Sequence, residues 1–211
     1  MFGLISSEVF TEFSTLLIFF LTVPLASLMT YNYIKKKGES RFYWSVGLWL
    51  FAFGVLIEVL FAFNIYSQIL IKTYIFTVAI LVAFLSLGSA VLLKNKKFFM
   101  YYSIFLILSA IFVEYSLINS NVGNVLTNHV VFGILPVLVV ISSSIMTFPA
   151  AAVLILTAVL SYRKTSSKKM LSIISGVVIV SIAGSLYIAH FPAFLYYSEF
   201  IGIFLLWLGF V

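Results

Sequence analysis

Two glutamates stand inside long apolar segments of this 211-residue chain. Glu58 lies near the end of RFYWSVGLWLFAFGVLIEVLFAFN (residues 41–64), and Glu199 lies in the apolar segment that closes the sequence. A helix over residues 41–64 is roughly 36 Å long, enough to cross a hydrocarbon core of about 30 Å. A carboxylate at that depth costs a few kcal/mol unless it is paired or hydrated. Proton uptake and cation binding are the chemistry that such residues perform.

Small residues share a helical face with both acids. Gly47, Phe51 and Gly54 fall on the same stripe as Glu58, and Gly202 follows Glu199 by about one turn. Because small residues mark helix-to-helix contacts in membranes, we expect both carboxyl groups to point into a helix bundle.

Four further ionisable residues map to the same outer level of the expected helices: Lys72, Glu114, His129 and His190. One interpretation is structural, with either glutamate paired to Lys72 in a shallow outward vestibule. A second is a substrate or proton pocket, lined by Glu58 and Glu199 together with Lys72, Glu114 and His190.

Two other interpretations of this outer level stay open. One is a metal or haem site on His129 and His190, a weak signal because two histidines have no recurring spacing. The other is a ligand-sensing pocket.

The composition is that of a polytopic membrane protein, with 64% hydrophobic and 9% charged residues. The absence of cysteine excludes disulfides and thiolate chemistry. The first residues lack the basic region of a secretory signal, so we expect an uncleaved first helix.

The sequence lacks the residues that several known activities require. Residues 193–211 hold no lysine for a retinal Schiff base, and two histidines are too few for a three-histidine zinc hydrolase or a two-haem cytochrome b. There is no GxSxG motif and no aspartate for a serine hydrolase. We therefore expect no enzymatic activity and no cofactor.

The apolar runs predict an all-α fold with seven transmembrane helices in a single domain over residues 1–211. They fall at about 10–34, 42–64, 69–93, 98–118, 130–161, 169–190 and 193–211. The fifth run is too long for one span, so the part before Pro136 is expected to be a loop or an interfacial turn.

Basic residues set the expected orientation in the cell membrane. Eleven of the twelve follow the first, third and fifth runs, and all but Lys72 therefore face one side. The positive-inside rule makes that side cytoplasmic, with the amino terminus outside and the carboxy terminus inside. These residues are accounted for by topology and lipid contact, so nucleic acid is not an expected partner. An outer aromatic belt is expected at Tyr66, Tyr74, Tyr115, Tyr187, Tyr196 and Tyr197.

A weak internal repeat links residues 10–94 with residues 130–211, with 98–118 as a linker helix. Each unit has a proline in its first helix, Pro24 and Pro149, and these are candidate hinges. In helix number, length and orientation this arrangement resembles the SWEET and PQ-loop transporters, although the chain contains no Pro-Gln pair.

Three segments carry a closer resemblance: RFYWSVGLWLFAFGVLIE, FLSLGSAVLL and GSLYIAHFPAFLYYSEFIGIFLLWLGF. They are similar to a family of small seven-helix membrane proteins of actinobacteria and archaea. That family has no assigned activity, so the resemblance implies the seven-helix fold and no particular chemistry.

The repeat and the two acids favour a small-solute or proton-coupled carrier with an outward polar pocket. One alternative is a non-catalytic accessory subunit of a larger membrane complex, in contact with lipid, quinone or haem. A seven-helix receptor is another.

Overall fold

The computed structural model describes residues 7–122, 126–127, 130–131, 135–166, 169, 171–173, 175–176, 179 and 192–210. Within these residues the fold is helical apart from connections and one short ladder. The helices are α1 (Ser7–Lys36), α2 (Glu39–Ala62), α3 (Gln68–Leu92), α4 (Lys96–Ile118), α5 (Val137–Thr165) and α7 (Pro192–Phe210). The number α6 is kept for the stretch between α5 and α7, in which residues 169, 171–173, 175–176 and 179 are helical.

Five of these helices, α1 to α5, are long and apolar enough to cross a membrane, and α7 contributes the shorter apolar stretch Tyr197–Gly209. This confirms an all-helical fold suited to a membrane. The expected run 169–190 falls largely outside the described residues, so seven spans and the internal repeat stay predictions.

Polar residues set the ends of the central helices. The side chains of Ser67 and Asn95 accept hydrogen bonds from the backbone N–H groups of Leu70 and Phe98, and so cap the first turns of α3 and α4. Asn64, in the α2–α3 connection, has a φ of 62°, a left-handed conformation that asparagine tolerates well. The expected bounds of these helices are confirmed to within three residues.

The fifth apolar run begins later than a helix from residue 130 would require. Strand β2 (Val130–Val131) pairs antiparallel with β1 (Leu126–Thr127), and α5 starts only after Pro136. Proline supplies no N–H group and suits the start of a helix, which is why Pro136 marks the boundary. A non-helical start before Pro136 was expected; a strand there was not.

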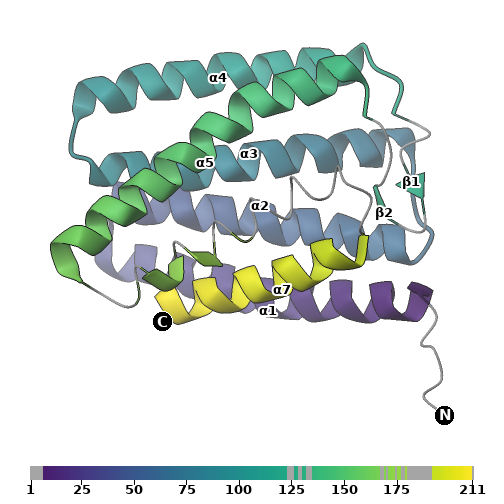
Figure 1. Cartoon of the computed structure of the whole chain (residues 1–211), viewed down its shortest axis with the longest axis horizontal. Coiled ribbons are helices and arrows are strands. Elements are labelled where there is room, and N and C mark those ends of the chain that lie inside the picture. Colours follow the sequence, from purple (N-terminus) through teal and green to yellow (C-terminus); the bar gives the residue numbers. More distant parts are fainter. Residues whose placement is uncertain are drawn as a thin grey trace.

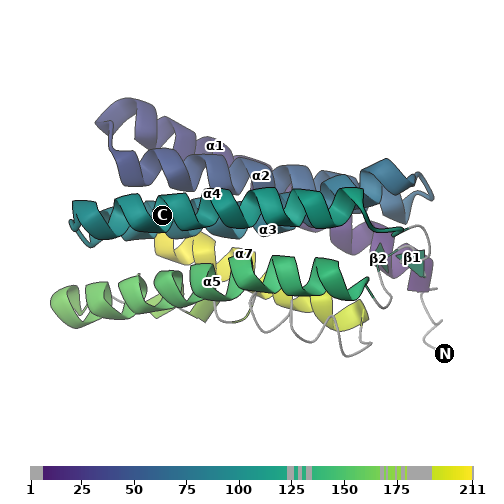
Figure 2. The ribbon, with the colours of Figure 1, turned by 90° about the horizontal axis from the view of Figure 1, so that it is seen from above.

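The helices run along one long axis, with α5 crossing the others obliquely (Figure 1). Seen from above, α5 and α7 lie on one side of the layer formed by α2, α3 and α4 (Figure 2). Each of α1, α2 and α3 packs on the next, α5 contacts both α3 and α4, and α1 contacts α7. Three clusters of buried side chains fill the spaces between these helices.

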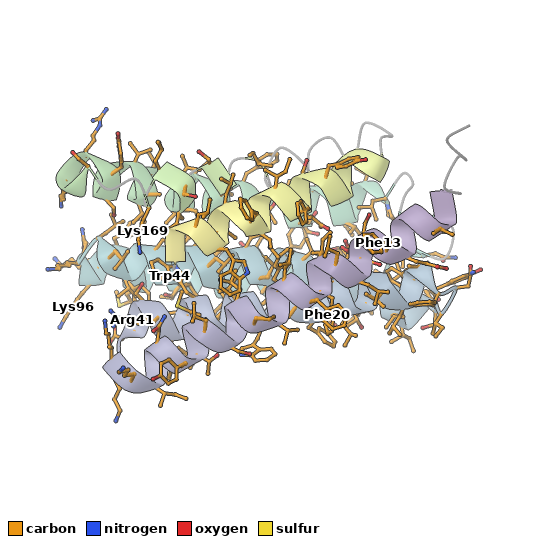
Figure 3. All side chains as sticks on the ribbon, turned by 90° about the horizontal axis from the view of Figure 1, so that it is seen from below. Phe13, Phe20, Arg41, Trp44, Lys96 and Lys169 are labelled. Carbon is orange, nitrogen blue, oxygen red and sulfur yellow. The ribbon has the colours of Figure 1, made fainter. Side chains whose placement is uncertain are left out.

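Basic residues near three separate helix connections lie at the same end of the bundle, which we call the basic end. Figure 3 shows Arg41, Lys96 and Lys169 there, whereas Phe13 lies toward the opposite end. This is the arrangement that the spacing of the basic clusters predicted.

Candidate functional site

The two glutamates of the apolar segments meet inside the bundle. Glu58 of α2 is 6% exposed and Glu199 of α7 is 7% exposed. Their carboxyl groups lie within hydrogen-bonding reach of each other. We call these two residues the acid pair.

Tyr74 of α3 is the third member of the site. Its hydroxyl donates a hydrogen bond of 2.5 Å to Oε1 of Glu58, and its ring packs edge-on against Phe61, with 5.6 Å between ring centroids. Tyr74 is only 9% exposed, so its expected place in an outer aromatic belt is wrong. The tyrosine positions the carboxyl group of Glu58 instead of anchoring the helix at the membrane surface.

The antiparallel packing of α2 and α3 brings Tyr74 to Glu58. Trp44 lies against Gly88, Gly47 against Leu85 and Gly54 against Thr77, so the contacts advance along α2 as they go back along α3. The next contact in this series is Glu58 with Tyr74. The glycines therefore mark the contact face of α2, as their spacing predicted.

The acid pair is closed off from the middle of the bundle by apolar side chains. Val55, one turn from Glu58, and Ile203, one turn from Glu199, pack with Ile18 of α1. Trp207 joins the same cluster and donates a hydrogen bond of 3.0 Å to the backbone carbonyl of Leu21. The carboxyl groups thus lie next to this apolar cluster, where a charge is poorly solvated.

Of the other expected site residues, Lys72 and Glu114 do not join the pair. Lys72 donates a hydrogen bond of 3.4 Å to the backbone carbonyl of Ile118, at the end of α4. Within the described residues no ion pair links it to either glutamate, so the geometry does not favour the Lys72 interpretation. Glu114 is exposed on α4. His129 and His190 lie outside the described residues.

The candidate hinge prolines sit inside continuous helices. Pro24 lies within α1 and Pro149 within α5, and both helices extend to either side. Each proline leaves the carbonyl four residues earlier without its usual helical hydrogen bond.

The acid pair has unused binding capacity. Oε2 of Glu58 and Oε2 of Glu199 are both buried and accept no hydrogen bond from a donor group in the part of the chain that the structure describes. Two carboxylate anions repel each other, and they form a hydrogen bond only when one carries a proton. The arrangement can therefore hold one positive charge, a proton or a cation, between two helices that are distant in sequence. Among the described residues, no group of three or more metal-ligating acidic, histidine or cysteine side chains accompanies it.

Comparison with known proteins finds no matching family model, no similar curated protein and no similar solved structure. The function must therefore be argued from the site itself.

Proposed function

We propose that the protein is a proton-coupled carrier of a small solute, and that the acid pair takes up and releases the coupling proton. The observation that carries this proposal is the approach of the Glu58 and Glu199 carboxyl groups, both more than nine-tenths buried and each with an Oε2 atom that accepts no hydrogen bond from the described residues. Acidic residues at such depth are costly, and in membrane proteins they recur in proton relays and ion pathways. No enzymatic step is part of the proposal.

Bending of α1 offers a route by which the pair changes its surroundings. Trp207 of α7 binds the carbonyl of Leu21, next to the carbonyl of Phe20 that Pro24 leaves free. A change of bend at Pro24 therefore moves α7, and Glu199 with it, relative to Glu58. The proposed carrier sits in the cell membrane with its amino terminus outside and its basic end in the cytoplasm.

The interpretation as an accessory subunit has less support. Its most direct sign would be an apolar face without a partner, and α4 has one, since most of its apolar length is not buried in the described part of the chain. Lipid covers such a face as well as a protein does, so α4 does not favour a subunit over a carrier.

The test is uptake into proteoliposomes under an imposed proton gradient. Neutral sugars, amino acids and inorganic cations would each be offered to the unmodified protein. We expect at least one to be taken up, with uptake lost in Glu58→Gln and in Glu199→Gln. Glu114→Gln is the matched control, because it removes an exposed acid from α4 and should leave uptake unchanged. Full proton-coupled uptake by both acid-pair variants would refute the proposal.

A further inference from the structure

The ligand that the acid pair accepts follows from the atoms that line it. Glu58 and Glu199 supply four carboxyl oxygens, and the hydroxyl oxygen of Tyr74 lies 2.5 Å from one of them. Two of these carboxyl oxygens are buried and accept no hydrogen bond from any donor group among the described residues. A compact group of oxygen atoms is what hard cations bind, whereas an anion would find no positive partner.

The charged and titratable groups on the neighbouring elements do not neutralise the pair. On α3, Tyr74 already donates to Glu58, and Lys72 is held at the carbonyl of Ile118. On α1 the nearest acid is Glu12, half-buried and more than one turn before Ile18. Arg41 of α2 and Lys169 of α6 lie at the basic end of the bundle. Among the described residues the site is therefore acidic only.

Charge conservation limits the valence of the ligand. Exchanging one shared proton for one monovalent cation leaves the net charge of the site unchanged, so the cost of burying that charge changes little. A divalent ion usually takes six or more oxygen ligands from several carboxylates and carbonyls, and the described residues supply only two acids here.

From these observations we propose that the solute bound at the acid pair is a monovalent inorganic cation of the sodium type, which replaces the shared proton. This inference rests on the proposed carrier function and names its solute class. The cation enters as the proton leaves to water, and the only bond broken is the O–H bond of one carboxyl group. Because the two ligands exclude each other, the exchange couples outward movement of one to inward movement of the other.

Modification of the acid pair by a hydrophobic carbodiimide tests this directly. The reagent attacks protonated buried carboxyl groups, and mass spectrometry of the purified full chain in detergent locates the adduct. We expect sodium chloride to protect Glu58 or Glu199 while choline chloride at equal ionic strength does not. The sodium concentration for half protection should fall about tenfold for each unit rise in pH, as one-for-one competition requires.

The outcomes separate this inference from the proposed function. Modification that depends on pH but responds equally to sodium and choline means a proton-only site, which overturns the inference and leaves proton coupling intact. Modification that is independent of both pH and sodium removes both proposals. Protection by magnesium at lower concentration than sodium overturns the monovalent assignment alone.

A second measurement covers the case in which the reagent fails to reach the site. Sodium chloride should raise the unfolding temperature of the unmodified protein relative to choline chloride, because a ligand that binds only the folded state stabilises it. This rise should be lost in Glu199→Gln and kept in Glu114→Gln. Where Glu199→Gln does not fold, Tyr74→Phe keeps both carboxyl groups and should weaken the sodium effect. An absent sodium effect in the unmodified protein contradicts the inference.

Discussion

The Tyr74 hydroxyl donates a hydrogen bond to Glu58 of the acid pair, so replacing Tyr74 with phenylalanine tests that hydrogen bond. Tyr74→Phe leaves Oε1 of Glu58 buried without that donor, and such a loss costs about 1–3 kcal/mol. We expect a lower unfolding temperature for the purified protein in detergent, and impaired proton coupling because Glu58 is no longer held in place.

Tyr101 provides the control for this substitution. Its side chain is 67% exposed on α4, so Tyr101→Phe removes the same atom from a different environment. Its unfolding temperature should match that of the unmodified protein. Equal losses in both variants would mean that the hydroxyl of Tyr74 has no special role at Glu58.

Sequence reasoning identified the acids more readily than their partner. The glycines on the same helical face as Glu58 correctly predicted that its side chain points into the bundle, because small residues mark close contacts between helices. Lys72 was the expected partner, but it lies two residues from Tyr74 and so points roughly 200° away around the helix. A usable signal existed: Glu58 and Tyr74 stand at equal distances in sequence from Tyr66, in the turn between their helices. Glu199 has no such local symmetry, since its approach depends on the packing of distant helices.

At the scale of elements, the α2–α3 contact depends on glycine where backbones approach most closely. A Cβ atom at Gly88 would lie 2.4 Å from Cδ1 of Trp44 and 2.9 Å from the backbone oxygen of Ser40. The backbone oxygen cannot move aside as a side chain can. We expect Gly88→Ala to lower the free energy of unfolding by about 1–3 kcal/mol, the usual cost of overpacking. Chemical denaturation in detergent measures this change.

Gly54 offers a matched control on the same pair of helices. A Cβ atom there would have Thr77 Cγ2 as its nearest neighbour, at 3.8 Å, which is an ordinary contact. Gly54→Ala should therefore be tolerated, and the higher helix propensity of alanine should offset any small loss of stability. A larger loss at Gly54 than at Gly88 would contradict the helix register described above.

Pro149 allows the hinge hypothesis to be separated from stability. It interrupts the hydrogen-bond ladder of α5 at the carbonyl of Ile145, and alanine would restore that bond. Pro149→Ala should raise the unfolding temperature or leave it unchanged, while the rate of solute uptake falls because α5 bends less readily. Uptake at the normal rate by a folded Pro149→Ala variant would exclude Pro149 as a hinge.

The bounds of the central helices were the feature of the fold most readily predicted from the sequence, since apolar runs end where charged residues and turn-forming residues begin. The start of α5 was less so, because Val130 and Val131 are as apolar as a membrane helix yet pair with Leu126 and Thr127 as strands. Apolar composition alone does not separate these two structures, and Pro136 was the better guide.

In the whole molecule, basic residues gather at one end of the bundle, so that end carries more positive charge than the other. Arg41, Lys96 and Lys169 lie near helix starts that are far apart in sequence, and they share that end. Cytoplasmic membrane leaflets carry negative surface charge and attract such groups. Such groups favour the cytoplasmic side by the positive-inside rule, so the orientation with the basic end inside stays a prediction, and it would decide from which side the proposed carrier takes its cation.

The absence of cysteine makes this orientation directly measurable, because any introduced thiol is unique. Tyr66, in the α2–α3 connection, and Lys97, in the first turn of α4, are both exposed and lie at opposite ends of α3. A membrane-impermeant maleimide should label the Tyr66→Cys variant in intact cells, and the Lys97→Cys variant only after the membrane is opened. The reverse pattern would place the basic end outside. Equal labelling of both in intact cells would mean that the chain inserts in both orientations, and that the basic end does not decide its direction.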